Sequence, residues 1–472
     1  MGSLIATQPK HIRVLDPGAG LGHLAVAVCE QLLKSRYSGQ ITLYLFENDA
    51  EILPILRQNM KMCHRRLMMG GLKVSIKIDH EDFLHLDTAK AEFVPVDVVV
   101  MNPPYFKIRK DSEYARVMSH VVHGQPNIYA LFMAKAVEML RPGGEIVAIT
   151  PRSFCNGPYF RAFRQWFFSR MSLKYVHLFE SRTDPFRDSQ VLQENVITIS
   201  KKHPRPQKTI EVSASFGRDF LQQPITKQIP NNIVFDNSLG ELIIRIPQGP
   251  KDQQIIRLVD SWPKRFGDLG LRVSTGPVVS FRATEFLLES LNGSNSTPLL
   301  SLHNVRPFKT GWPLQKNGKP LAFKVSKESE RLLLPRNNYV LLRRFSSKEE
   351  RRRLTASCFL SHLWESPYVA LENHLNYIYH ATRNLTENEV YGLAALFNSM
   401  LLDQYFRTVS GNTQVNAAEI RSMRFPSLSS IANMGSRLIK AKDFSPSFVE
   451  NVVLDELGIR GTLKKYLTEP AT

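Results

Sequence analysis

The chain has 472 residues, of which 22% are charged, and a formal net charge of +18 at pH 7. This length predicts two or three domains and a core that needs no disulfides. The cysteines, Cys29, Cys63, Cys155 and Cys358, form no C-x-x-C pair, which argues against a zinc knuckle and a disulfide framework and favours a reducing cytoplasm. No segment predicts a membrane span or a signal peptide. The positive charge favours a polyanionic partner, and DNA, RNA and acidic membranes all satisfy that criterion.

The first two hundred residues alternate between apolar strand-like runs and helix-like segments. Strands are predicted at residues 12–15, 41–46, 74–78, 96–101 and 145–149, and helices at residues 24–33, 52–68 and 129–140. The last helix is expected to end at the turn Arg141-Pro142-Gly143-Gly144. Near-continuous apolar strands separated by helices are typical of a parallel sheet covered on both faces. We therefore predict a doubly wound, Rossmann-like α/β domain over residues 1–203.

The pattern changes at residues 201–206, where two prolines and several bases in a short run predict a linker. Beyond it, short β-rich runs at residues 242–246 and 339–342 and a helix at residues 387–402 indicate a separate α+β domain over residues 204–472. The mixed-sign run at residues 348–353 predicts an exposed helix face with internal ion pairs, with phosphate contacts by its arginines as the alternative.

A glycine-rich turn, Asp16-Pro17-Gly18-Ala19-Gly20-Leu21-Gly22, follows the first predicted strand. A strand, such a turn and a helix together bind nucleotides and adenosine-containing cofactors, because glycines let the backbone approach the ligand and the helix directs free N–H groups at it. The turn alone does not separate NAD, FAD and S-adenosylmethionine. The NAD fingerprint requires glycine at position 23 or 25, where this chain has His23 and Ala25. The acid-first form therefore favours S-adenosylmethionine, bound by Asp16, Gly18, Gly20 and Gly22.

Acidic residues follow the next two predicted strands. Glu47 is expected to accept hydrogen bonds from both ribose hydroxyls of the cofactor. Asp82 and Phe83 are candidates for the adenine ring, the carboxylate for its amine and the aromatic ring for its face. A loop aspartate that precedes a core phenylalanine is an equally weighted alternative for this pair.

The tetrapeptide Asn102-Pro103-Pro104-Tyr105 directly follows an apolar strand, at the edge where open α/β sheets bind ligands. A proline-rich turn at a strand end is the structural alternative. The amide oxygen of Asn102 and the backbone carbonyl of Pro103 can each accept one N–H of a planar amine, which directs the nitrogen lone pair at a sulfonium methyl. Tyr105 offers a face on which a flat ring can stack. The motif therefore predicts methyl transfer to a planar nitrogen.

Together these motifs and their order resemble the gamma-class N6-adenine DNA methyltransferases of restriction–modification systems, of the PstI/BsuBI type. The resemblance implies S-adenosylmethionine as cofactor, a flipped-out adenine in double-stranded DNA as substrate, and protection against a cognate restriction endonuclease. It also implies that Phe186 stacks on the adenine opposite Tyr105, although a core phenylalanine in a β-hairpin is an alternative. The class usually carries a Gly-x-Phe/Tyr-x-Thr-Pro element upstream of the glycine-rich turn. Here only residues 1–12 lead into the first strand, so we expect that the chain begins late.

The second half resembles a target-recognition domain and contains five candidate DNA contacts: Arg306, Arg343, Arg344, Asn412 and Gln414. Arginine reads guanine and asparagine or glutamine reads adenine in the major groove, but a solvated surface residue is an equal alternative at each position. Other open functions are cytosine N4 methylation, an RNA-base or protein-glutamine methyltransferase with the same tetrapeptide, and a catalytically inactive DNA-binding or specificity protein. The length of the second half favours a protein that reads double-stranded DNA. We expect the protein to act as a monomer and to bind no metal.

Overall fold

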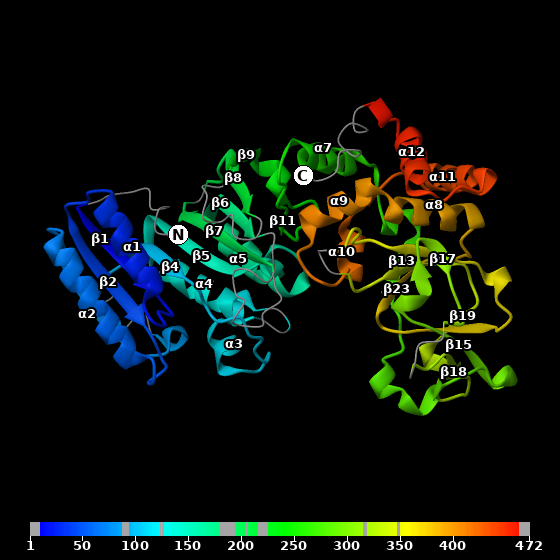
Figure 1. The fold of residues 1–472 in the computed structure, drawn as a ribbon, viewed down its shortest axis with the longest axis horizontal. Helices are drawn as coiled ribbons and strands as arrows, with labels where there is room; N and C mark the ends of the chain where they lie inside the picture. The colour runs from blue at the N-terminus through cyan, green and yellow to red at the C-terminus, as the bar shows by residue number, and fades with distance from the viewer. Residues whose placement is uncertain are drawn as a thin grey trace. The chain divides into compact units, whose positions relative to one another are not determined.

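The computed structural model describes residues 10–86, 94–122, 124, 127–179, 194–203, 205–215, 225–314, 319–346 and 350–461. The chain divides into two compact units, Met1–Gln248 and Gly249–Thr472 (Figure 1). This division differs from the domain boundary predicted between residues 203 and 204. The difference arises because the chain continues in the sheet of the first unit beyond residue 204, where two further strands join it. The proline-containing run at residues 201–206 is therefore a connection within one sheet.

A nine-stranded sheet forms the centre of the first unit, in the order β3-β2-β1-β4-β5-β7-β6-β8-β9. Its strands are β1 (His11–Asp16), β2 (Gln40–Phe46), β3 (Lys73–Asp79), β4 (Val96–Met101), β5 (Leu140–Pro151), β6 (Met171–Phe179), β7 (Asn195–Lys202), β8 (Thr209–Ser215) and β9 (Lys227–Pro230). Strands β1 to β5 pair in parallel, whereas β7 runs antiparallel to both β5 and β6. The order of the first five strands confirms the doubly wound arrangement, with the reversal of strand order between β1 and β4, the position at whose carboxyl edge open α/β sheets bind ligands.

The helices of the first unit are α1 (His23–Lys34), α2 (Leu53–Met69), α3 (Glu113–Val117), α4 (Ile128–Met139), α5 (Arg161–Phe168) and α6 (Asn231–Val234). Helix α1 buries Ala25, Val28, Cys29 and Leu32, the spacing of one helix face. These side chains join one core with α2 and strands β1 and β2, drawn in blue in Figure 1.

The turn predicted at residues 141–144 lies within the span of β5, which begins directly at Leu140. The pairing with β4 passes from Val96–Leu140 to Val98–Glu145, so residues 141–144 bulge out of the ladder, and Gly143 has a φ of 78°. The Nζ atom of Lys202 donates to the carbonyl oxygens of Val137 and Leu140, both at 2.7 Å. A basic group from β7 thus stabilises the carboxyl end of α4.

The second unit contains two larger sheets and is α+β, as predicted. The six-stranded sheet has the order β13-β23-β20-β21-β17-β16 and the five-stranded sheet the order β14-β18-β15-β22-β19. Their strands are β13 (Leu271–Thr275), β14 (Leu287–Leu288), β15 (Ser296–Leu300), β16 (Val305–Arg306), β17 (Phe308–Thr310), β18 (Ala322–Lys324), β19 (Leu333–Pro335), β20 (Tyr339–Arg343), β21 (Ala356–Phe359), β22 (Tyr368–Leu371) and β23 (Leu375–His380). Short pairs are formed by β10 (Phe235–Asp236) with β11 (Ile243–Ile244) in the first unit, and by β12 (Lys264–Arg265) with β24 (Arg424–Phe425) in the second.

The helices of the second unit are α7 (Pro250–Ser261), α8 (Glu387–Asn398), α9 (Met400–Val409), α10 (Ala417–Ser422), α11 (Leu428–Ala441) and α12 (Pro446–Glu456). The single helix predicted over residues 387–402 is therefore wrong. The break falls at Ser399, whose hydroxyl caps α9 by accepting the backbone N–H of Leu402 at 3.2 Å.

The prediction of an exposed helix face at residues 348–353 also fails for residues 350–353, the part that the structure describes. These residues are not helical, and Arg353 is only 1% exposed. Its Nε donates to the hydroxyl of Ser346 at 3.1 Å, and its backbone N–H donates to the carboxylate of Asp403 at 2.6 Å. The charge run therefore contains a buried structural arginine.

Candidate active site at the carboxyl edge of the first sheet

The glycine-rich turn between β1 and α1 uses left-handed backbone conformations. Gly20 and Gly22 have φ values of 52° and 83°, a region that side chains disfavour. A Cβ atom on Gly22 would lie 2.6 Å from Cε of Met60, whereas none of the described atoms lies within 4 Å of the corresponding position on Gly20. Gly22 is thus needed for packing against α2, and Gly20 borders open space that a ligand can fill.

Glu47, directly after β2, is held by the backbone of this turn. Its Oε2 accepts the N–H of Gly20 at 2.8 Å, and its Oε1 accepts the N–H of Asp49 at 2.9 Å. A carboxylate has about four acceptor positions, so both oxygens retain capacity for hydroxyl donors. The geometry orients Glu47 for the ribose role that the sequence predicts and leaves that role a prediction.

Asp16 ends β1 and is 1% exposed. Neither carboxylate oxygen makes a hydrogen bond within the described parts of the chain. Burial raises the pKa of Asp16 to about 7, a net value to which the backbone N–H of Gly18 contributes by lowering the pKa and the negative charge of Glu47 by raising it. A buried carboxylate without a partner favours a cationic ligand group, such as the ammonium of S-adenosylmethionine. The residues present therefore fit that cofactor.

Asp82 and Phe83 follow β3, but both have partners within the protein. Oδ1 of Asp82 accepts the N–H of Leu84 at 3.0 Å, and Oδ2 accepts the hydroxyl of Tyr114. Phe83 is 2% exposed, and its ring packs 5.5 Å from that of Phe46. The geometry matches the structural alternative of a turn aspartate before a core phenylalanine, and an adenine contact here stays a prediction.

Asn102 follows β4, so it lies at the same sheet edge as the ends of β1 and β2. Its side chain is exposed, and its Oδ1 accepts a hydrogen bond from the hydroxyl of Tyr105 at 2.5 Å. The same hydroxyl lies 3.1 Å from the carbonyl oxygen of Ile149 on β5. Burial raises the pKa of Tyr105, so the phenol keeps the proton that it donates. Sequence reasoning assigned stacking to the Tyr105 ring but did not foresee this contact.

The other members of the tetrapeptide differ in burial, with Pro103 buried and Pro104 exposed. Behind them the ring of Tyr105 meets the edge of the buried Tyr129 ring, with centroids 6.3 Å apart. Tyr129 itself hydrogen-bonds the hydroxyl of Ser153 at 2.9 Å. The turn after β4 therefore rests on a rigid aromatic layer.

Phe186 lies outside the described residues. Nearby, the structure contains an ion pair that sequence reasoning missed. Nη1 of Arg152 and Oε2 of Glu194 are 2.9 Å apart, and the two side chains are 3% and 1% exposed. The backbone N–H of Arg152 also donates to the carbonyl of Glu194 at 2.7 Å. The pair joins the end of β5 to the start of β7, and opposite charges at two strand ends were its only signal in the sequence.

The five candidate DNA contacts form two groups in the second unit. Arg343 donates through Nε to the carbonyl of Val305 at 2.9 Å, the residue before the exposed Arg306. Arg344 donates to Oε1 of Gln414 at 3.2 Å, and Nδ2 of Asn412 contacts Glu419 at 3.4 Å. Four of these side chains thus have structural partners, and their contacts with DNA stay predictions.

Comparison with known proteins identifies the family. The sequence profile described as Eco57I restriction-modification methylase matches residues 40–186. The type II methyltransferase M.PstI of Providencia stuartii is 31% identical over 462 residues, covering 97% of this chain and 90% of the relative. The type II methyltransferase M.BsuBI of Bacillus subtilis is 34% identical over 449 residues, covering 91% and 86%. The chain belongs to the type II methyltransferases of restriction–modification systems. Membership of this family confirms the predicted DNA methyltransferase class and makes S-adenosylmethionine the expected cofactor.

Two solved structures are similar to this type II methyltransferase with lower sequence identity. A DrdV–DNA complex has a TM-score of 0.49 and 12% identity, covering 91% of this chain and 54% of that chain. The type IIG restriction endonuclease BpuSI has a TM-score of 0.45 and 15% identity, covering 96% and 64%.

Two features are absent from the residues that the structure describes. None of the helices described here is long and apolar enough to cross a membrane. The same portions of the chain contain no group of three or more His, Cys, Asp or Glu placed to hold a metal ion.

Proposed function

We propose that this type II methyltransferase transfers a methyl group to N6 of an adenine that has swung out of double-stranded DNA. One observation carries the proposal: the amide oxygen of Asn102 is held by the hydroxyl of Tyr105, at the sheet edge that also presents Asp16 and Glu47. This arrangement puts a fixed hydrogen-bond acceptor beside groups that suit the cofactor.

The chain's own groups account for recognition of a planar amine. Oδ1 of Asn102 retains a second lone pair beside the one that Tyr105 occupies, and can accept one N–H of the amine. The carbonyl of Pro103 can accept the other, which holds the nitrogen lone pair in one direction. When bound, S-adenosylmethionine supplies an electrophilic methyl group on a positively charged sulfur. Asp16 would attract its ammonium group and Glu47 would hold its ribose, while Tyr105 and Phe186 would stack on the adenine.

The proposal extends to the context of the reaction. An adenine within a duplex must leave the stack to reach the Asn102 edge, at a cost of a few kcal/mol. The net charge of +18 suits phosphate contacts that offset this cost. We further propose that the protein acts as a cytoplasmic monomer, since methylation of each strand can be a separate event, and that a cognate restriction endonuclease is its functional partner.

The deciding experiment measures transfer of labelled methyl from S-adenosylmethionine to unmethylated genomic DNA, followed by nucleoside analysis. We expect N6-methyladenine with the wild type. Asn102→Ala should lower kcat at least about 100-fold, because it removes the oxygen that accepts a hydrogen bond from the substrate amine in the transition state. Asn433→Ala is the matched control, since Asn433 lies on α11 and contacts Glu456 at 3.2 Å. Labelled N4-methylcytosine would contradict the choice of base. Transfer to ribosomal RNA or release factor alone, run in parallel, would overturn the substrate class.

A further inference from the structure

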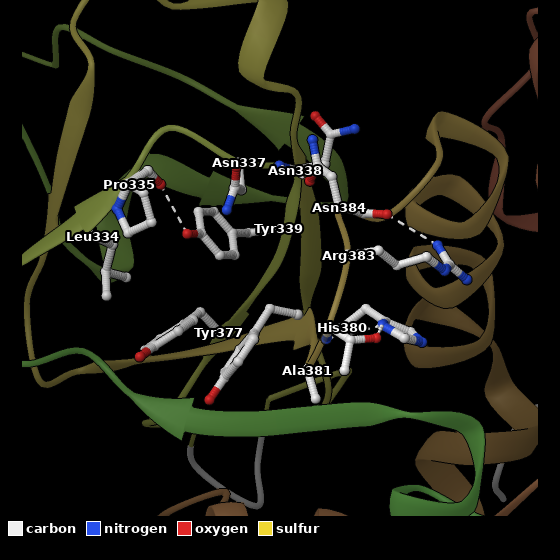
Figure 2. A pocket seen from close by; sticks show the side chains of 12 residues that line it. Leu334, Pro335, Asn337, Asn338, Tyr339, Tyr377, His380, Ala381, Arg383 and Asn384 are labelled. Carbon is white, nitrogen blue, oxygen red and sulfur yellow. Dashed lines mark hydrogen bonds between the residues drawn. The ribbon is translucent and has the colours of Figure 1, made fainter.

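The second unit contains a cleft of about 490 Å³ between β19, the start of β20 and the end of β23 (Figure 2). None of the residues that line it belongs to the predicted DNA contacts or to the candidate active site. Its volume falls within the range of small-ligand sites. The cleft is thus a separate candidate binding site.

Tyrosine rings form the main wall of this cleft. Tyr377 and Tyr379 are two residues apart on β23 and share one face of the strand, with ring centroids 5.4 Å apart and planes 22° from parallel. Both are half-buried. Tyr339, on the neighbouring strand β20, meets Tyr377 edge-on at 5.7 Å. Figure 2 shows the labelled Tyr339 and Tyr377 on this wall. The stacked rings of Tyr377 and Tyr379, with Tyr339 packed edge-on against Tyr377, form a platform on which another flat ring can stack.

The platform is rigid before any ligand arrives. Tyr339 is 3% exposed, and its hydroxyl donates to the carbonyl of Pro335 at 2.8 Å. At the rim, Nδ2 of Asn338 donates to the carbonyl of Leu385 at 2.6 Å, and its Oδ1 accepts the N–H of Ser361 at 2.8 Å. Little conformational freedom is lost when a ligand binds to such a surface.

The basic groups of the cleft carry no uncompensated charge. The guanidinium of Arg383 forms two hydrogen bonds with the carboxylate of Glu389, at 2.6 and 2.8 Å. Burial and the positive charge of Arg383 lower the pKa of His380, so its ring is neutral at pH 7. Phosphate binding requires an available cation or a cluster of N–H donors. The interior of the cleft suits a neutral flat ring with polar edges better than a phosphate group.

We propose that this cleft binds a nucleobase that has left the base stack of DNA, with the base lying against Tyr377 and Tyr379. The proposal rests on the proposed DNA substrate but not on the chemistry at Asn102. A nucleobase is the neutral aromatic ring that a DNA-binding protein encounters, and the exposed Asn337 at the rim offers both a donor and an acceptor to its edge. Stacking of one base on an aromatic side chain strengthens binding by about tenfold or more and tolerates any sequence.

Photochemical crosslinking tests the proposal without knowledge of the recognition sequence. The full-length protein is irradiated with an oligonucleotide that carries 5-iododeoxyuridine in a single-stranded gap, and the crosslinked peptide is identified by mass spectrometry. We expect attachment at Tyr377 or Tyr379. Attachment only at other sites would overturn the proposal.

Binding measurements supply the second readout. We expect Tyr379→Leu to weaken binding of gapped DNA about tenfold, with little change for fully paired DNA of the same length. Tyr379→Phe, which keeps the ring and the fold, should bind gapped DNA as the wild type does. Tyr159→Leu is the control, since Tyr159 belongs to the first unit and is 56% exposed. An equal loss with paired DNA would contradict base stacking.

Asn102→Ala separates this proposal from the proposed function. This variant should keep the crosslink at the cleft while it loses methyl transfer. If the wild type crosslinks at the cleft but transfers no methyl group, the cleft proposal holds and the proposed function fails. If methyl transfer is normal and neither tyrosine crosslinks, the cleft proposal alone fails.

Discussion

The candidate active site of the first unit and the candidate recognition surface of the second are built in different ways. In the first unit, the side chains of interest come directly after parallel strands, and backbone amides of adjacent turns hold them, as with Glu47 and the N–H of Gly20. In the second unit, the tyrosine platform combines β20 and β23, two strands that are not consecutive in the chain but pair in the sheet. Four of the five DNA contacts predicted for the second unit bind other protein groups.

The difference teaches which kind of site a single sequence reveals. A strand, a turn and a helix place their side chains by local geometry, so residue types at fixed spacing carry the information. A surface that depends on the pairing of distant strands has no such local signature. Variants in the first unit should therefore impair methyl transfer and cofactor binding, whereas variants in the second unit should impair DNA binding.

The largest effect in this comparison is expected for the pH dependence at Asp16. The carboxyl has a pKa of about 7 in the folded protein, and only its ionised form attracts a cationic ligand group. Cofactor affinity should therefore rise between pH 5 and 7, by at most about tenfold per pH unit, and level off above pH 7. Titration calorimetry at several pH values measures this slope, which Asp16→Asn should abolish.

The pH dependence of stability, measured without cofactor, is an independent test of the raised pKa of Asp16. The folded pKa of Asp16 exceeds the ordinary value of 3.8, so the unfolded chain ionises first as the pH rises. Stability should fall between about pH 4 and pH 7, because the folded state then binds more protons than the unfolded state. Urea denaturation of Asp16→Asn should show a smaller decrease than the wild type, since Glu419 and Glu450, whose pKa values burial also raises, remain. Asp111→Asn, at a surface ion pair with Arg109, should keep the full decrease. An unchanged profile in Asp16→Asn would contradict the assignment.

Gly22→Ala should have the next largest effect. It combines backbone strain at a left-handed φ with a steric clash against Met60, whereas its control has the strain alone. Alanine at φ of 83° costs about 1–2 kcal/mol, and its Cβ atom would also meet Met60 at 2.6 Å. Gly71→Ala is the matched control, since Gly71 has φ of 81° with none of the described atoms within 4 Å of a Cβ, and precedes β3 at the other sheet edge. We expect both variants to lose stability in urea denaturation, and only Gly22→Ala to lose cofactor affinity, about tenfold. Equal cofactor affinity in the two variants would place the cofactor away from the turn.

Local rules predicted the first unit well. The strand expected over residues 96–101 has these bounds in the structure, and the other parallel strands of the prediction also exist, because continuous apolar runs have few alternatives in a covered sheet. The boundary at residues 203/204 did not follow from local pattern, since β8 pairs in parallel with β6, some thirty residues earlier. The burial of Arg353 was equally hidden, because its partner Asp403 lies on α9, some fifty residues later in the chain.

Tyr105→Phe tests whether the hydroxyl acts through Asn102, an effect that belongs to the first unit alone. The ring that would stack on the substrate remains, but the hydrogen bonds to Asn102 and Ile149 are lost. One hydrogen bond contributes about 0.5–1.5 kcal/mol, so we expect kcat to fall up to about tenfold with KM for DNA unchanged. Tyr114→Phe, which removes the contact with Asp82, should leave kcat closer to the wild type. A change in KM alone would assign Tyr105 to substrate binding only.

The smallest effect is expected in the second unit, for Arg306→Ala. Arg306 is exposed, in contrast to the half-buried Arg343 and Arg344, so its removal should alter DNA contacts and leave folding unchanged. If Arg306 contacts a phosphate, DNA affinity should fall a few-fold and the slope of log affinity against log salt should decrease by about 1. Fluorescence anisotropy at several salt concentrations measures both quantities. Arg437→Ala is the control, since Arg437 pairs with Asp455 at 3.2 Å on the helical side of this unit. An unchanged slope in Arg306→Ala, together with a crosslink at Tyr377, would shift DNA recognition from the arginine surface to the tyrosine cleft.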